Sequence, residues 1–325
     1  MDISVIIPVY NRYADLQHCV TSLLCQVGCR FEIIIVNDAG TDGDYDLFAS
    51  LSENVTVRNS PTNAGPSSAR NIGIIMAKGD YILFLDSDTI LPNVNILADF
   101  LAFFAEHPDA GTVGGEIRLY FNDQTLVHGQ SFWGAGRRKK DVAIPNEPGV
   151  WGECDYLATC CCMVPTNLAR TIGGFDPYYV FGSEDTDFGY RIRQLGYSNC
   201  IAADCAVHHF HSPGGRNVDE TYRYHFTTLR FALKHRSIDS LPLLVLRTIF
   251  SAILFYLILL PKLIWLLLTG QKLVKENLTG GYLMVKALTR CLGIYGEIRA
   301  STGRNFLAPD EILGFERWLK EGKKI

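Results

Sequence analysis

The sequence predicts an α/β fold in which a doubly wound, mostly parallel sheet carries a ligand site at one edge. Three observations support this prediction. Short apolar runs alternate with segments of helical periodicity in the N-terminal part of the chain. The run at 81–85 has no turn residue and is typical of a strand buried on both faces. Asp86 and Asp88 follow it directly, at the strand end where ligands of such sheets bind.

The predicted elements follow from residue type and spacing. β-Branched and aromatic runs predict strands, whereas apolar residues three or four positions apart predict helices. The stretch 113–151, which contains Gly, Pro and a basic run, is expected to form loops over the sheet edge. In chain order we expect strand 3–7, helix 13–26, strand 31–36, helix 45–51, strand 55–58, helix 67–77, strand 81–85, helix 185–195, strand 201–207 and helix 222–235.

Composition and charge narrow the class of protein. The 325 residues are 48% hydrophobic and carry a formal net charge of −4, which is a globular composition with no sign of a nucleic-acid partner. The first apolar run begins at Ile3 without the basic stretch of a signal peptide, so we expect a cytosolic start. Because neither GxGxxG nor GxxxxGK[ST] is present, a nicotinamide dehydrogenase or a P-loop ATPase is disfavoured.

The ten cysteines do not form a recognisable framework. No CxxC pair occurs, and Cys160, Cys161 and Cys162 are consecutive. Without an export signal they are expected to be reduced and mostly buried. A structural zinc site around Cys200, Cys205 and the nearby histidines lacks the usual paired ligand spacing and is not favoured.

The composition changes sharply near residue 237. From 241 to 268 the only charged residues are Arg247 and Lys262, and Pro261 interrupts the apolar run. A helix of this length would be roughly 42 Å long, more than the ~30 Å of a bilayer core. We therefore expect membrane association through 241–268, as a re-entrant or interfacial hairpin broken at Pro261. One tilted span, or a buried core or oligomer contact, are the alternatives.

Asp86 and Asp88 point to a specific kind of site. Residues i and i+2 of an extended chain point the same way, so both carboxylates can face one hard cation or its ligands. The alternative is an Asp-rich turn that caps the strand. Loops at 8–12 and 36–43, and the helix start at 63–73, are expected at the same sheet edge. Such a site suits a nucleotide diphosphate. Acids can accept hydrogen bonds from the ribose hydroxyls, an Arg can pair with phosphate, and a divalent cation can bridge the phosphates to the Asp pair.

Five motifs occur in a fixed order along the chain. They are Val5-Ile6-Ile7-Pro8-Val9-Tyr10-Asn11, Val36-Asn37-Asp38, Ala69-Arg70-Asn71-Ile72-Gly73, Phe84-Leu85-Asp86-Ser87-Asp88, and Gly173-Gly174-Phe175-Asp176 leading to Glu184-Asp185. In order and spacing they resemble those of the family 2 glycosyltransferases, which have the GT-A fold. The resemblance covers 3–234, and the sequence is similar to non-processive bacterial polysaccharide and rhamnosyltransferase-like members. It implies transfer of one sugar, with inversion, from a UDP- or dTDP-type sugar to a hydroxyl of a glycan or polyprenyl-linked glycan.

The resemblance also implies roles for individual residues. Asp185 is expected to be the general base, with Glu184 beside it in the acceptor region, although an acid-rich helix start explains the same pair. Asp88 is expected to bind Mg²⁺ or Mn²⁺ on the diphosphate. The other expected residues are the donor contacts Pro8, Tyr10, Asn11, Asp38, Arg70 and Asp86, a further metal ligand at His208 or His211, and Trp133 near the acceptor.

Some positions depart from the family pattern. Asn37 and Ala39-Gly40 stand where many members have Asp and Gly-Ser, which leaves the nucleobase preference open. The segment 159–162 replaces a commoner glycine-containing stretch near the acceptor. The QxxRW motif of processive synthases is absent, which favours addition of a single sugar.

The sequence therefore predicts a catalytic domain at 1–236, a membrane-associated helical segment at 237–270 and an amphipathic tail at 271–325, on the cytoplasmic face of a membrane. Two alternatives stay open. One is another nucleotide-dependent transferase on a similar sheet, such as a nucleotidyltransferase, and the other is a membrane-anchored scaffold that binds nucleotides without turnover.

Overall fold

The computed structural model describes residues 1–120, 125–127, 129–133, 138–179, 182–210, 218–235, 241–269 and 276–312. These residues form two compact units. The first, which we call the sheet unit, consists mainly of Met1–Val180 and Glu184–Ser212, with a further segment from Asn305. The second, the helical unit, consists mainly of Pro213–Arg304.

The sheet unit contains the predicted doubly wound sheet, which is confirmed. Its described residues form an eight-stranded sheet in the order β11-β13-β6-β12-β4-β1-β2-β3. Neighbours β4, β1, β2 and β3 are parallel, as are β13 and β6, whereas β12 and β11 run antiparallel to their partners. The strands are β1 (Ile3–Val9), β2 (Phe31–Asn37), β3 (Val55–Asn59), β4 (Tyr81–Leu85), β6 (Ala110–Gly114), β11 (Trp151–Cys154), β12 (Cys161–Pro165) and β13 (Ser198–Ala202).

Helices cover both faces of this sheet, which explains why its strands are continuously apolar. In β1, Val5 and Ile7 pack in one core cluster, whereas Ile6 between them packs in the other. Gly73 lets a helix approach β1 closely, because a Cβ there would lie 2.3 Å from the Ile6 side chain. The first cluster includes residues of α1 (Tyr13–Leu24), η1 (Tyr45–Ser50) and α3 (Ile96–Glu106), and the second includes residues of α2 (Pro66–Met76), α4 (Thr166–Thr171) and α5 (Glu184–Gln194).

The stretch predicted to form loops contains short strands instead. One of them, Ile117–Leu119, pairs with the distant segment Val207–His209 and also with the nearby Thr125–Val127, and Gly129–Trp133 pairs with the nearby Arg138–Val142. The predicted strand at 201–207 is also wrong as one element, because η2 (Ala203–Cys205) separates two strands that belong to different sheets. The second sheet has the order β5 (Thr89–Ile90), β14 (Val207–His209), β7 (Ile117–Leu119) and β8 (Thr125–Val127), and β9 (Gly129–Trp133) pairs with β10 (Arg138–Val142).

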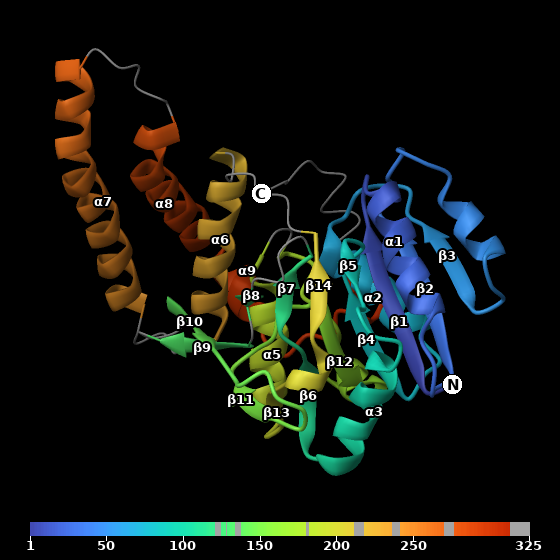
Figure 1. Cartoon of the computed structure of the whole chain (residues 1–325). Helices are drawn as coiled ribbons and strands as arrows, with labels where there is room; N and C mark the ends of the chain where they lie inside the picture. The colour runs from blue at the N-terminus through green and yellow to red at the C-terminus, as the bar shows by residue number, and fades with distance from the viewer. Residues whose placement is uncertain are drawn as a thin grey trace. The chain divides into compact units, whose positions relative to one another are not determined.

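The helical unit consists of α6 (Val218–His235), α7 (Leu241–Thr269), α8 (Glu276–Gly293) and α9 (Tyr295–Ala300). Figure 1 shows α8 lying between α6 and α7, and Phe226, Leu244 and Leu288 share its buried cluster. The expected break at Pro261 does not occur, since α7 is one continuous helix. Proline removes one backbone donor, but the Leu- and Ile-rich sequence on both sides continues the helical pattern. Because α6 groups with α7 and α8, the compact units do not follow the expected division at residue 236.

Candidate active site

The site lies where the parallel strands of the large sheet end. Asp86 follows β4, and its main-chain oxygen accepts a hydrogen bond of 3.0 Å from the Thr89 amide. The Asp86–Thr89 segment is therefore a turn rather than the extended chain that we expected. The turn does not prevent the two carboxylates from belonging to one site, because Arg70 contacts Asp86 and Arg12 contacts Asp88.

Arg70 connects the two acidic motifs. Its side chain is only 3% exposed, and its Nη2 donates to Asp86 Oδ1 over 2.8 Å. Its Nη1 donates to Glu184 Oε1 over 3.3 Å, and the guanidinium lies 5.5 Å from the centre of the Phe175 ring. One buried cation from α2 thus ties the end of β4 to the start of α5, 114 positions along the chain from Arg70.

Asp88 is paired with a guanidinium group and an imidazole ring. Arg12 Nη1 lies 3.1 Å from Asp88 Oδ2, and His209 Nε2 lies 3.1 Å from Oδ1. Burial raises the pKa of the Asp88 carboxyl, but the hydrogen bond from His209 and the charges of His209 and Arg12 outweigh burial and lower it. Asp88 is therefore a charged acceptor that already attracts positive charge. Sequence reasoning did not assign Arg12 to the site, although it lies in the loop after β1.

The structure brings a histidine that was not expected to Asp88. His209, rather than His208, lies beside Asp88, and the His208 ring instead lies 6.0 Å from that of Tyr120. Alternation along a strand sends neighbouring side chains to opposite faces, so only one of the two can reach the site. Burial lowers the pKa of His209, but the hydrogen bond and charge of Asp88 outweigh burial and raise it. His211 lies outside the described residues.

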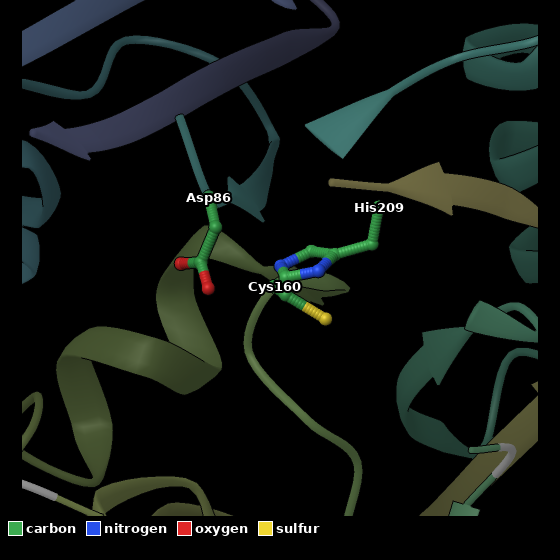
Figure 2. Close-up of side chains that lie close together, drawn as sticks. All are labelled: Asp86, Cys160 and His209. Atoms are coloured by element: carbon green, nitrogen blue, oxygen red, sulfur yellow. The ribbon is translucent and has the colours of Figure 1, made fainter. Parts of the chain in front are cut away.

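The acids and His209 fit a divalent cation. Carboxylate oxygens suit Mg²⁺ and Mn²⁺, and a neutral imidazole is a common additional ligand. Among the described residues, Asp86, Cys160 and His209 offer ligand atoms that all lie within 4.8 Å of one another. Figure 2 shows these three side chains projecting into one space from three separate segments. Burial raises the pKa of the Cys160 thiol well above its ordinary value, so the free protein holds it protonated.

The Glu184-Asp185 pair begins α5. Asp185 Oδ1 accepts hydrogen bonds from the Thr186 amide (2.6 Å) and hydroxyl (3.0 Å), so this acid also caps the helix start. Burial, followed by the charge of Asp185, raises the pKa of Glu184. The Oε2 atom of Glu184 is buried without a hydrogen-bond partner among the described residues. Both expected readings, helix cap and reactive carboxylate, are therefore compatible with the geometry.

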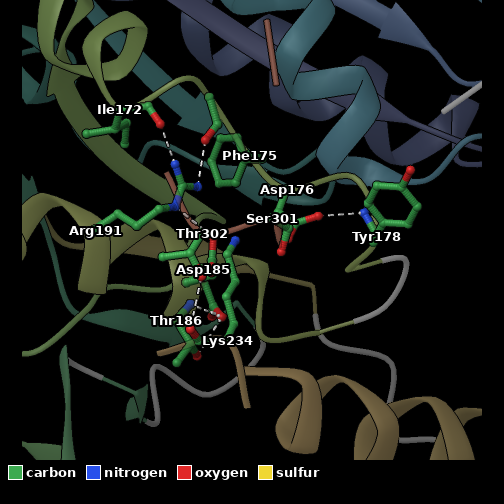
Figure 3. A network of polar contacts seen from close by, with 12 residues as sticks. Ile172, Phe175, Asp176, Tyr178, Asp185, Thr186, Arg191, Lys234, Ser301 and Thr302 are labelled. Carbon is green, nitrogen blue, oxygen red and sulfur yellow. Dashed lines mark hydrogen bonds and ion pairs between the residues drawn. The ribbon is translucent and has the colours of Figure 1, made fainter. Parts of the chain in front are cut away.

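Arg191 fixes the Gly-Gly-Phe-Asp segment that leads to this pair. It donates hydrogen bonds of 2.6 Å to the carbonyls of Ile172 and Gly174, and Figure 3 shows the bond to Ile172. Gly173 and Gly174 have φ values of 78° and 70°, which favour glycine. The motif is therefore a tight turn held by α5 itself. Sequence reasoning missed Arg191, although its position seven residues after Glu184 places it on the same helix.

Asp38 holds the backbone at the start of α2. Its two oxygens accept hydrogen bonds from the amides of Ala64 (2.9 Å) and Gly65 (2.7 Å), and burial raises its pKa despite these bonds. Asp38 thereby positions the helix that carries Arg70. Each carboxylate oxygen retains a second lone pair that can accept from a base.

The remaining expected residues are placed as follows. Pro8 is half-buried at the end of β1, and Tyr10 is 50% exposed just beyond it. Asn11 has a φ of 50°, and its side-chain oxygen accepts a hydrogen bond of 2.8 Å from the Thr41 amide, which joins the loops after β1 and β2. The backbone of Trp133 pairs with Arg138 in the β9–β10 hairpin, and its side chain lies outside the described residues.

The sequence matches a family model and several known proteins. The family model described as Glycosyl transferase family 2 matches residues 4–158. Glycosyltransferase GlyG of Streptococcus pneumoniae is 39% identical over 137 residues, which is 40% of this chain and 45% of that protein. The poly(ribitol-phosphate) beta-glucosyltransferase of Bacillus spizizenii is 40% identical over 103 residues, 30% of this chain and 16% of that protein. The chain thus spans less than half the length of each of these relatives.

The fold also matches solved structures. The crystal structure of GalNAc-T7 with UDP, GalNAc and Mn²⁺ superposes with a TM-score of 0.57 and 19% identity, over 70% of this chain and 48% of that one. At this identity the similarity concerns the fold alone. It agrees with the mixed sheet described above.

Proposed function

This chain carries a family 2 glycosyltransferase domain with the GT-A fold, and on that premise we propose that it is an inverting, metal-dependent glycosyltransferase. It would move one sugar from a nucleotide-diphosphate sugar to a hydroxyl of a glycan or lipid-linked glycan. The observation that carries the proposal is the buried Arg70, which joins Asp86, at the expected donor side, to Glu184, beside the expected base.

Inversion is a single in-line displacement. Asp185 would take the proton of the acceptor hydroxyl while the acceptor oxygen forms its bond to the anomeric carbon. The bond from that carbon to the diphosphate oxygen breaks at the same time, and the nucleoside diphosphate leaves with the electron pair. Arg12, at the same strand end, can meet phosphate charge. Arg70 keeps the donor-side and acceptor-side acids in one fixed arrangement.

Asp88, with Asp86 and His209, would hold Mg²⁺ or Mn²⁺. When bound, such an ion supplies positive charge to the leaving diphosphate. On the donor side, we expect Asp38 and Pro8 to lie at the nucleobase, and Asp86 near the ribose or the sugar. Tyr10, Asn11 and Arg70 complete the expected donor contacts, with a UDP- or dTDP-type donor favoured.

The acceptor and the membrane belong to the same proposal. Within α7, Leu241–Leu260 has a mean hydropathy of 2.5 and is 17% buried, so by length and composition this helix can cross a bilayer. Phe250 and Ile258 are 65% and 70% exposed. We expect α7 to bind the cytoplasmic face of a membrane, or to span it, where a polyprenyl-linked acceptor would be available.

Titration calorimetry of the full-length protein with UDP, dTDP and GDP, each with and without Mn²⁺, tests the proposal. CMP serves as the control. One nucleoside diphosphate should bind tightly only with the metal, and that result also narrows the donor. Asp88→Ala should remove the Mn²⁺ dependence, whereas Asp109→Ala, which changes an exposed acid in a turn, should not. If the folded protein binds none of these nucleotides, the proposal is wrong.

A further inference from the structure

Cys160 lies in the site because of strand register. The pairing of β12 with β4 sets Cys161 opposite Leu85, and the Asp86 amide donates a hydrogen bond of 3.1 Å to the Cys160 carbonyl. Cys160 is therefore held next to Asp86 by the main chain. The residue is only 9% exposed, so it forms part of the inner wall of the site rather than the surface.

A second register brings the third group. The pairing of β14 with β5 sets His209 opposite Thr89, and the Phe210 amide donates a hydrogen bond of 2.9 Å to the Asp88 carbonyl. Three segments that are far apart in sequence thus deliver a carboxylate, a thiol and an imidazole to one place. Because backbone pairing fixes all three segments, little rearrangement is needed to bring the ligand atoms from 4.8 Å or less onto one ion.

This donor set differs from that of a magnesium site. Mg²⁺ prefers oxygen ligands, whereas a thiolate and an imidazole select zinc and similar cations. Three protein ligands with one open position is also the usual form of a catalytic zinc site. Asp86 is free to contribute because Arg70 contacts its Oδ1 atom, which leaves Oδ2 for a metal.

We propose that Asp86, Cys160 and His209 form a mixed oxygen–sulfur–nitrogen site for a thiophilic divalent cation, Zn²⁺ first of all, and that Cys160 determines the metal preference of this site. As the metal–sulfur bond forms, the thiol proton leaves to solvent, and no electron is exchanged. The inference adds Cys160 to the metal site given under Proposed function and puts Zn²⁺ ahead of Mg²⁺ and Mn²⁺ there. Its consequence in catalysis rests on that proposed function. Its test, however, uses the metal alone.

Metal binding to the metal-free, full-length protein tests the site. Every protein carries Cys25→Ser, because Cys25 is the exposed cysteine and its thiol would otherwise be open to adventitious metal. Titration with Co²⁺ should produce a thiolate-to-cobalt charge-transfer band. Cys160→Ser should abolish that band and weaken Zn²⁺ binding, measured against a chromophoric chelator, by at least the roughly 10–100-fold that loss of an outer partner costs. Mg²⁺ affinity should change little.

The matched control is Cys162→Ser, which removes a buried thiol two residues away in a separate core cluster. It should retain the band. X-ray absorption of the wild-type zinc complex needs no core substitution and should show one sulfur at about 2.3 Å. A zinc complex without sulfur, or an unchanged band in Cys160→Ser, overturns the proposal. Since no nucleotide is present, either result leaves the donor titration to decide the proposed function independently.

Discussion

Strand β1 and helix α7 are both almost wholly apolar, yet their surroundings are opposite. In β1, Ile6 and Ile7 have no exposed surface, because helices cover both faces of the sheet. In α7, Phe250, Leu257 and Ile258 are largely exposed among the described residues. An all-round apolar element needs apolar cover on every side. Helices of the sheet unit cover β1 on both faces, and we expect lipid to cover α7.

The sheet unit shows a second contrast, because it buries charge as well as apolar groups. Arg70 and Asp88 lie inside the site in pairs, whereas an isolated buried charge would be expensive. Such charges are retained where they serve chemistry or positioning. The sheet unit thus buries charged groups, whereas α7 exposes apolar groups, so the two regions depart from ordinary burial in opposite ways.

The largest effect is expected at Asp185. Asp185→Asn removes the proposed base but keeps the shape of the side chain, so turnover should fall by about 10²–10⁴-fold. Donor binding should be unchanged, because the general base acts on the acceptor. The measurement is the steady-state rate of nucleoside diphosphate release together with donor affinity.

Glu184→Gln is the comparison for this prediction, because it neutralises the neighbouring acid. It should weaken the contact with Arg70 and leave the base in place. Near-normal turnover in Asp185→Asn, with the greater loss in Glu184→Gln, would move the base to Glu184.

Arg70→Met is expected to have the next largest effect. It leaves Asp86 and Glu184 without their shared cation, and breaking a buried ion pair costs about 3–5 kcal/mol of unfolding free energy. Urea denaturation of the variant measures this difference. The matched control is Arg30→Met, whose pair with Asp2 has the same 2.8 Å separation but lies at the surface. An equal loss of unfolding free energy in both variants would mean that the ion pairs of Arg70 stabilise the fold no more than a surface pair does.

Much of the fold was predictable because local pattern determines it. The strands at 3–7, 31–36 and 81–85 and the helix at 185–195 fall within one or two residues of β1, β2, β4 and α5. The pairing of β7 with β14 was not predictable, since β14 lies far along the chain. The pairs β7–β8 and β9–β10 are local, but Gly, Pro and a basic run in this stretch led us to expect loops. The continuation of α7 through Pro261 was missed because proline usually ends a helix.

The site residues, too, could be predicted only in part from the sequence. Asp86, Asp88, Arg70 and Glu184 could be found from motifs, and the structure brings them to one strand end. The placement of His209 and Cys160 depends on which residue of β14 faces β5 and which residue precedes β12. A one-residue slip in register would turn each side chain to the other face, and sequence alone does not fix that register.

The exposed face of α7 yields the third prediction. The double change Phe250→Asp and Ile258→Asp should release the protein from membranes, because each Asp costs about 3 kcal/mol or more at the centre of a bilayer-spanning helix. Flotation with liposomes containing anionic lipid measures the bound fraction. The control is Leu51→Asp with Leu195→Asp, two exposed leucines of the sheet unit, 56% and 51% accessible. If the two double variants are released from liposomes equally, α7 is not the part of the protein that binds lipid.

The smallest effect is expected where α8 packs against α7. Gly280 and Gly281 face two aromatic rings, and a Cβ at Gly281 would lie 2.4 Å from the Tyr256 ring. Tyr256 also accepts a hydrogen bond of 2.9 Å from the Tyr282 amide. Gly281→Val should therefore separate the helices and cost about 1–3 kcal/mol, the usual range for overpacking.

Gly293→Ala is the control for this substitution, because nothing lies within 4 Å of a Cβ at that position of the same helix. It should be neutral or stabilise the protein by up to about 1 kcal/mol, since alanine restricts the unfolded chain. Thermal unfolding in detergent measures both variants. If Gly281→Val also proves neutral, the α7–α8 contact is too loose to hold α7 in place. The apolar face of α7 would then be positioned by lipid alone, which would sharpen its contrast with β1, whose cover is built into the chain.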